Sequence, residues 1–160
     1  MSDSRYAKEC SRYRTKLSNF CNEIRPSFIS SALSSLGYTE KDLPNLLSSN
    51  SEKLSELVEK IARMTGSAKG NMNSIWYSGV ILRLLDLCEI NCAVHICVAL
   101  PTKVNDTNNY NFSFVNYMYV STETEVSYHY FNGILSDENF TYFSDEVYVR
   151  NIYVDEDEEE

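Results

Sequence analysis

A stripe of apolar side chains near the start of the chain is its first clear pattern. The members recur at spacings of four and three residues: Tyr6, Cys10, Tyr13, Leu17, Phe20 and Ile24. This spacing brings side chains to one face of a helix, so a helix is predicted over 4–24. Arg25-Pro26 ends it, because the residue before a proline is pushed out of the helical region. The same stripe could also serve as a pairing seam between two chains.

Four more helices are predicted in the first 90 residues from their end signals. Pro26 suits a first helical turn, and Gly37 suits the residue after a helix end. Thr39 followed by Asp42 has the form of a capping pair, and Ser51 is a good cap for the helix after it. The last helix is nearly all apolar and is predicted to form the centre of the core. The predicted ranges are 26–36, 39–47, 52–65 and 73–90.

After Asn91 the period of the apolar pattern changes from helical spacing to alternation, which is typical of strands. Asn132-Gly133 is the strongest hairpin signal, because both residues tolerate a positive φ. Strands are predicted at 92–100, 110–121, 125–131 and 146–154, and the segment 140–143 stays undecided. The second half of the chain is therefore predicted to be an antiparallel sheet.

Together these patterns predict an α+β fold in a single domain over 1–154. A helical half with about five helices, 1–90, is expected to pack on a sheet half of four to five strands, 91–154. The remaining residues, 155–160, are all Asp or Glu. Such a segment cannot bury apolar surface, so a disordered acidic tail is predicted.

Charge is divided unevenly between the two halves. Residues 1–90 hold 12 Lys and Arg against 10 Asp and Glu, a balance of +2, whereas residues 91–160 hold 2 against 13, a balance of −11. A nucleic-acid surface over the whole protein is therefore disfavoured. The best candidate for an anionic partner is the polar face of the first helix, formed by Arg5, Lys8, Arg12 and Lys16. A solvated or protein-contacting face remains the alternative interpretation.

The densest set of metal-type ligands is Cys88, Cys92, His95 and Cys97. The set spans a predicted helix end and a strand, and Cys92 and Cys97 point to opposite faces of that strand. All four could hold one zinc ion only with a bulge or a break, so core packing is the favoured interpretation and metal the alternative. No cofactor is predicted. No catalytic motif is recognised, and a cysteine-dependent enzyme is the third functional hypothesis.

Aromatic residues are concentrated in the sheet half and supply the leading functional hypothesis. Thirteen of the nineteen Tyr and Phe residues lie in 91–160, on both faces of the predicted strands. A sheet with aromatic side chains on both faces is expected to be covered twice, once by the helices and once by a partner. The sequence therefore predicts a non-enzymatic interaction or assembly protein, which pairs with a protein partner or a second copy of itself. A nucleic-acid-binding protein using the first helix is the alternative.

The cellular location is predicted from the start of the sequence, its most apolar stretch and its cysteines. The start of the sequence carries no basic segment followed by an apolar one, and charged residues interrupt the most apolar stretch, 75–100. The five cysteines are an odd number and suit reduced thiols. A cytoplasmic or nuclear protein without a membrane partner is predicted.

Overall fold

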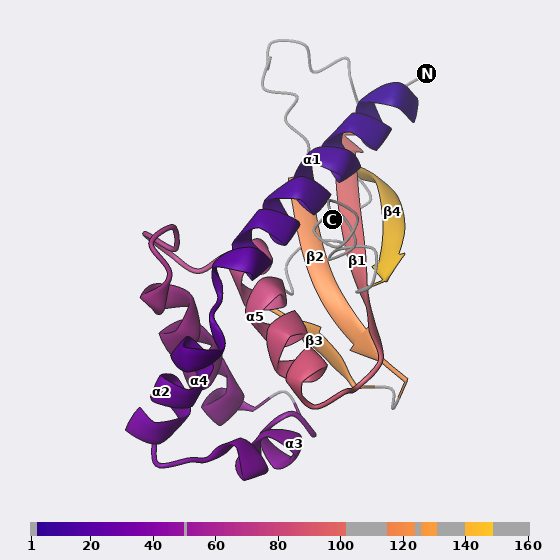
Figure 1. The fold of residues 1–160 in the computed structure, drawn as a ribbon. Coiled ribbons are helices and arrows are strands. Elements are labelled where there is room, and N and C mark those ends of the chain that lie inside the picture. Colours follow the sequence, from indigo (N-terminus) through magenta and orange to yellow (C-terminus); the bar gives the residue numbers. More distant parts are fainter. Residues whose placement is uncertain (1–2, 50, 102–114, 124–125, 131–139, 149–160) are drawn as a thin grey trace, which may run out of the picture.

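A computed structural model describes residues 3–49, 51–101, 115–123, 126–130 and 140–148, with side chains described within 7–49, 51–96, 118–123 and 126–130. Helices fill the described part of the first half (Figure 1). Their bounds are α1 Asp3–Glu23, α2 Pro26–Ser35, α3 Leu43–Leu46, α4 Glu52–Met64 and α5 Ser74–Leu87, with a 3-10 turn η1 at Glu40–Asp42. The predicted series of helices is confirmed to within three residues at each end.

Local hydrogen bonds explain why these helices begin and end where they do. The Asp42 carboxylate accepts the backbone N–H of Thr39 at 2.8 Å, and the Thr39 side chain caps η1 in return. The hydroxyl of Ser51 accepts the backbone N–H of Leu54 at 3.3 Å and caps α4. Gly37, just after α2, has a φ of +86°, a conformation that side chains with a Cβ rarely adopt. The predicted capping residues are thus confirmed.

The sheet in the described residues has four strands in the order β3-β2-β1-β4, and each neighbouring pair is antiparallel. The strands are β1 Cys92–Pro101, β2 Val115–Thr122, β3 Ser127–His129 and β4 Phe140–Tyr148. The chain is therefore α+β, with an antiparallel sheet in its second half, as predicted.

Strand β4 corrects one detail of the prediction. The sequence left 140–143 undecided and began a separate strand at 146, whereas one strand covers Phe140–Tyr148. Ser144 and Asp145 interrupt the apolar pattern, yet they pair in register with Cys97 and Ile96 of β1. Ladder hydrogen bonds join backbones, so a polar residue does not end a strand that has a neighbour to pair with.

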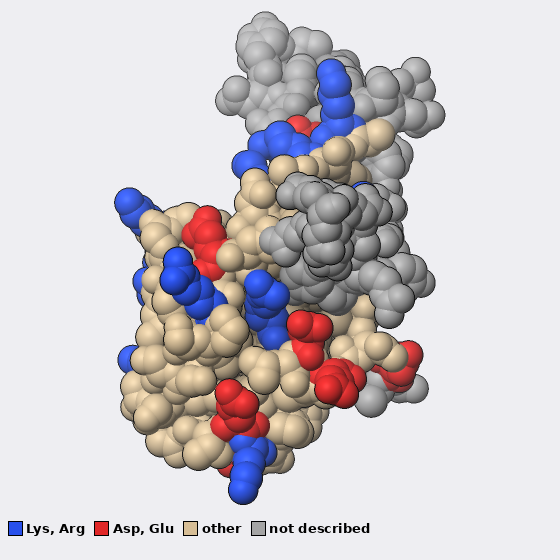
Figure 2. Space-filling view, in the orientation of Figure 1, with Lys and Arg blue, Asp and Glu red and all other residues tan. Residues whose placement is uncertain are grey.

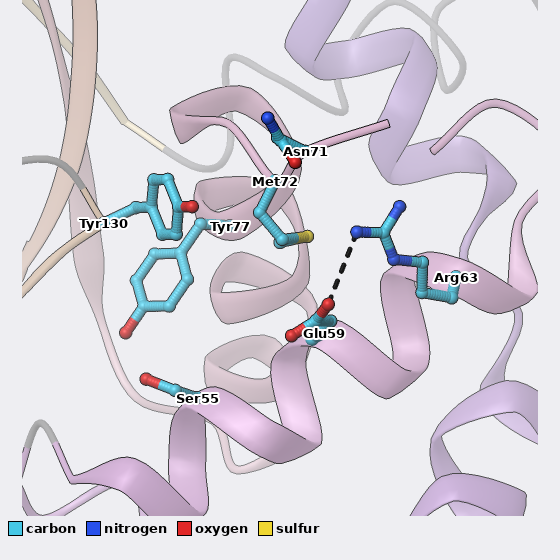
Figure 3. Close-up of a pocket in the computed structure, with 7 residues that line it drawn as sticks. All are labelled: Ser55, Glu59, Arg63, Asn71, Met72, Tyr77 and Tyr130. Carbon is cyan, nitrogen blue, oxygen red and sulfur yellow. Dashed lines mark hydrogen bonds and ion pairs between the residues drawn. The ribbon is translucent and has the colours of Figure 1, made fainter. Parts of the chain in front are cut away.

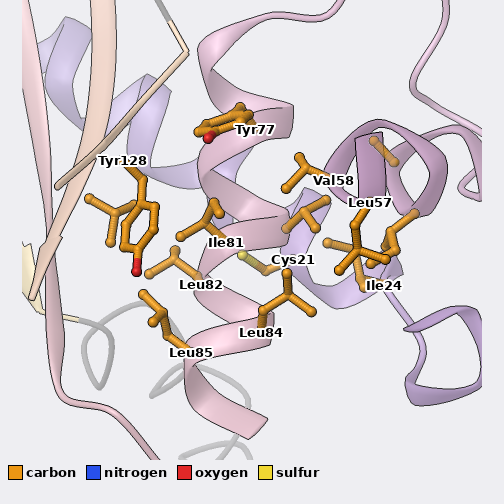
Figure 4. Packing of buried hydrophobic residues seen from close by; sticks show 14 of the residues in the cluster. Cys21, Ile24, Leu57, Val58, Tyr77, Ile81, Leu82, Leu84, Leu85 and Tyr128 are labelled. Carbon is orange, nitrogen blue, oxygen red and sulfur yellow. The ribbon is translucent and has the colours of Figure 1, made fainter. Parts of the chain in front are cut away.

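Helix α5 lies at the centre of the core, as its apolar composition predicted. It packs against α1 and α4 on its helical sides and against the sheet (Figure 1). On the sheet side, Ile81, Leu82 and Leu85 lie beside Tyr128 of β3 (Figure 4). The α4 side contacts buried residues such as Leu57. The helices α1 and α5 thus cover one face of the sheet, and this inner face carries Val94, Ile96, Met118, Val120 and Tyr128.

Helices α1 and α5 approach each other closely at Gly79. A Cβ at this position would lie 2.6 Å from Cδ2 of Phe20 and 3.6 Å from Sγ of Cys21. Arg83, one turn later on α5, donates from Nε to the carbonyl of Cys21 at 2.9 Å. The apolar stripe of α1 therefore packs against α5 over its second half, where Leu17 and Cys21 are fully buried.

Three expectations concern residues outside the described ranges. They are the acidic tail over 155–160, the Asn132-Gly133 turn and parts of two strands, the first part of the one predicted at 110–121 and the last part, 149–154, of the one predicted at 146–154. Within the described ranges, no helix has the length and apolar character needed to cross a membrane.

Candidate functional site

The predicted basic face lies on α1 and is exposed where its side chains are described. Lys8, Arg12 and Lys16 are exposed, and the side chain of Arg5 lies outside the described ranges. Blue side chains gather along the N-terminal half of α1 (Figure 2). The Arg12 guanidinium pairs with Glu9 at 2.8 Å, which neutralises part of this face. Arg12 therefore offers an anionic partner less charge than the sequence suggested.

A tyrosine ring also orders two of these cations. The guanidinium carbon of Arg12 lies 5.7 Å from the ring centroid of Tyr13, and the ammonium of Lys16 lies 5.8 Å from it. Cation–π contacts of this length are worth less than about 1 kcal/mol at exposed sites. They hold the two side chains along the helix without removing their charge.

The cysteine and histidine set does not converge in the described part of the structure. Cys88 ends α5, Cys92 starts β1, and both lie partly buried against the core. His95 is three residues after Cys92, so its side chain points to the opposite face of β1. The side chain of Cys97 is outside the described ranges. Among the described side chains, no group of three or more His, Cys, Asp and Glu residues could hold a metal ion.

Burial also suppresses the reactivity of the two partly exposed thiols. It raises the pKa of Cys92 to about 12, with a smaller contribution from the negative charge of Asp86. The pKa of Cys88 is raised as well, by burial first and then by Glu40. Both thiols are therefore protonated at neutral pH, and the thiolate is the nucleophilic form.

The outer face of the sheet, which points away from α1 and α5, carries a row of three stacked rings. Register pairs His95 of β1 with Tyr119 of β2, and Tyr119 with His129 of β3. The His95 and Tyr119 rings are 4.4 Å apart with planes 7° apart, and the Tyr119 and His129 rings are 4.4 Å apart with planes 17° apart. We call these three residues the aromatic row. All three are half-buried.

The surroundings of the aromatic row are polar but carry little charge. His95 Nε2 lies 2.8 Å from the hydroxyl oxygen of Ser121. The next row of the outer face pairs Ala93 with Ser121 and Ser121 with Ser127. Partial burial lowers the pKa of His129, and the neighbouring His95 lowers it further. A proton on His129 is therefore disfavoured. On the β4 side, the register partner of His95 is Glu146.

A pocket of about 490 Å³ lies between α4, the segment before α5, α5 itself and the end of β3 (Figure 3). Its lining residues are Ser55, Glu59, Arg63, Asn71, Met72, Tyr77 and Tyr130. The rings of Tyr77 and Tyr130 are 5.7 Å apart and tilted by 40°. Arg63 and Glu59 form an ion pair at 3.3 Å, and Arg63 also donates to the carbonyl of Ala68 at 3.2 Å. The pocket thus joins an aromatic side to a side with paired charges.

Sequence reasoning missed both the aromatic row and the pocket. Ser55, Glu59 and Arg63 recur at a spacing of four on α4, which marks a polar stripe. This stripe could have been found, but its position opposite Tyr130 depends on how the sheet packs.

Comparison with known proteins adds no further guide to function. No family model, no curated protein and no solved structure matches the chain.

Proposed function

We propose that the protein is a non-enzymatic assembly protein that self-associates through the outer face of its sheet. The observation that carries the proposal is the aromatic row, His95, Tyr119 and His129, on the face that α1 and α5 do not cover. Stacked half-exposed rings offer apolar area that a partner can bury with little loss of side-chain freedom, because they already hold one another in place.

The charge of this face favours a second copy of the chain as its partner. A two-fold interface places the same surface on both sides, so a charged surface would meet its own charge. The six described positions of the two outer rows on β1, β2 and β3 carry rings, hydroxyls and one methyl group: Ala93, Ser121, Ser127, His95, Tyr119 and His129. The row that contains His95 continues on the edge strand β4 with Glu146, the register partner of His95, so two copies that meet over β1, β2 and β3 keep this carboxylate at the margin of the contact.

Sedimentation velocity over a range of protein concentrations tests this proposal. The wild-type chain is expected to shift from monomer to dimer as its concentration rises. Tyr119→Ser removes the central ring of the row and should weaken the dimer at least tenfold. Tyr13→Ser is the matched control, because it removes a half-exposed tyrosine from α1 on the helical side.

Two results would overturn the proposal. One is a wild-type chain that stays monomeric at every concentration. The other is a dimer that Tyr13→Ser weakens and Tyr119→Ser leaves intact, which would locate the contact on the α1 seam. Salt supplies a further check: screening reduces repulsion between two chains that each carry −9, so added salt should strengthen the dimer.

A second candidate function rests on the exposed cations of α1. Lys8, Arg12 and Lys16 line one helical face and could neutralise phosphates of a nucleic acid. This binding would weaken with salt, opposite to the dimer. If Lys8→Glu combined with Lys16→Glu changes neither the affinity for a short RNA duplex nor its salt slope, the candidate fails.

A further inference from the structure

We propose that the pocket between α4, α5 and the end of β3 binds a short uncharged peptide segment of a partner protein and receives one aromatic side chain from it. The pocket is lined by α4, the segment before α5, α5 and Tyr130 (Figure 3), whereas the aromatic row lies on the outer face of the sheet. Peptide binding here is therefore independent of self-association.

The aromatic side of the pocket consists of one buried ring, Tyr77, and one exposed ring, Tyr130. Tyr77 is only 3% exposed, and burial raises its pKa, while a hydrogen bond with Ser55 opposes this rise. Tyr130 is 44% exposed, and its ring packs against the buried ring of Tyr77. Met72, a half-buried thioether, faces the same space. Sulfur and ring faces are favourable surroundings for an incoming aromatic side chain.

The polar side of the pocket matches a peptide backbone. Glu59 offers carboxylate oxygens that accept N–H groups, and Arg63 offers N–H groups that donate to a carbonyl. Their ion pair, together with the bond from Arg63 to the carbonyl of Ala68, holds the two groups side by side. A peptide amide presents one donor and one acceptor and leaves the ion pair neutral. A charged ligand would have to compete with one member of the pair.

Size and charge favour a peptide over a nucleobase. A volume of about 490 Å³ lies within the range of small-ligand pockets and suits one ring with its flanking backbone. A nucleoside also has a ring with donors and acceptors. Among the described lining residues, however, Arg63 is the one cation, and Glu59 already pairs with it, so these residues offer a phosphate group no cation of its own. A nucleobase is therefore an alternative outcome of the test.

Nuclear magnetic resonance of full-length protein labelled at the methionine methyl groups tests the proposal. The probe is the uncharged peptide N-acetyl-Gly-Phe-Gly-amide, and the comparison ligands are N-acetyl-Gly-Ala-Gly-amide and guanosine. The phenylalanine peptide should produce a saturable shift of the Met72 methyl signal, at least fivefold tighter than either comparison ligand. Tyr119→Ser should bind it as wild type does, because that residue belongs to the other surface.

Substitutions locate the binding within the pocket. Tyr130→Ser should weaken the phenylalanine peptide at least fivefold. Leu87→Ser is the matched control, because Leu87 is the other large exposed apolar residue among those described, at 39%. Glu59→Gln should weaken binding severalfold while leaving the melting temperature nearly unchanged, since exposed ion pairs contribute little to stability.

The proposal is overturned if no ligand gives a saturable shift at Met72, or if the alanine peptide binds as tightly as the phenylalanine peptide. Tighter binding of guanosine would reassign the pocket to nucleobases. Equal losses in Tyr130→Ser and Leu87→Ser would show that the effect is not specific to the pocket.

Discussion

The imidazole of His129 stacks on the phenol ring of Tyr119, with their centroids 4.4 Å apart. The two residues are cross-strand partners on β3 and β2, so the stack follows from the strand register. It holds a titratable ring beside an aromatic one on the outer face of the sheet. The aromatic row is therefore the proposed contact surface and also carries a histidine whose pKa burial lowers.

Folding stability should fall as the pH falls below the ordinary pKa of histidine. Burial lowers the pKa of folded His129, and His95 lowers it further, whereas the unfolded chain keeps a value near 6.5. The unfolded chain therefore takes up the proton first. The folding stability is therefore full above about pH 7 and falls as the pH drops through 6.5 toward the folded value. Urea unfolding in dilute protein at several pH values measures this loss.

The groups around His129 determine which control substitutions the pH experiment needs. The neutral Tyr119 ring separates His129 from His95, His95 contacts Ser121, and Glu146 of β4 is the register partner of His95. His129→Gln should reduce the pH slope between 7 and 5. His95→Gln should raise the titration midpoint of His129, followed by the ring proton signals. A midpoint of His129 at or above 6.5 in the wild type would contradict the prediction.

Tyr128→Phe should destabilise the fold by about 1–2 kcal/mol. The buried Tyr128 hydroxyl donates to the backbone carbonyl of Leu47, which joins the sheet to the end of α3. Removing the hydroxyl leaves that carbonyl without this donor in a buried place, at a cost of about 1–3 kcal/mol. Tyr130→Phe, at an exposed tyrosine of the same strand end, should change the unfolding free energy by less than about 0.5 kcal/mol. Equal effects of the two substitutions in urea unfolding would refute the role of the bond.

Gly79→Ala should destabilise the contact between α1 and α5. A Cβ at this position would lie 2.6 Å from the ring of Phe20, which is itself buried. The strain of an overpacked core costs about 1–3 kcal/mol, and the better helix propensity of alanine returns about 1 kcal/mol. A net loss of up to about 2 kcal/mol is expected in thermal or urea unfolding. Gly66→Ala is the control, because a Cβ there meets nothing within 4 Å and should be nearly neutral.

Ser78→Ala should stabilise the protein by about 1 kcal/mol. Ser78 lies in α5 with no exposed surface, and its hydroxyl has no hydrogen-bond partner among the described residues. A buried hydroxyl without a partner is unfavourable, and alanine is the better helix former. Ser35→Ala removes a hydroxyl that donates to the carbonyl of Ala32 at 2.9 Å and should bring no gain. A loss of stability in Ser78→Ala would show that its hydroxyl is bonded after all.

The helices could be predicted because their signals are local. Pro26, Gly37 and Ser51 each act through a backbone bond or dihedral within a few residues of themselves. The buried stripe of α1 and the central place of α5 followed from spacing and composition alone. Local rules thus predict each helix, its bounds and the face that it buries.

Relationships between distant segments could not be predicted. β4 is one strand because β1 supplies its ladder bonds, although Ser144 and Asp145 break the apolar pattern. The aromatic row depends on the register of three strands, in which a slip of one residue would turn the rings to the other face. The pocket depends on α4 and the end of β3 meeting across α5. None of these arrangements can be predicted from the residue spacing within a single segment.

Intermolecular nuclear Overhauser effects between labelled and unlabelled chains test the central claim most directly. A mixture of isotope-labelled and unlabelled protein, at a concentration where the dimer forms, reports only contacts between two copies. The proposal predicts such contacts at the rings of His95, Tyr119 and His129. Contacts confined to α1, or none in a sample that sediments as a dimer, would contradict it.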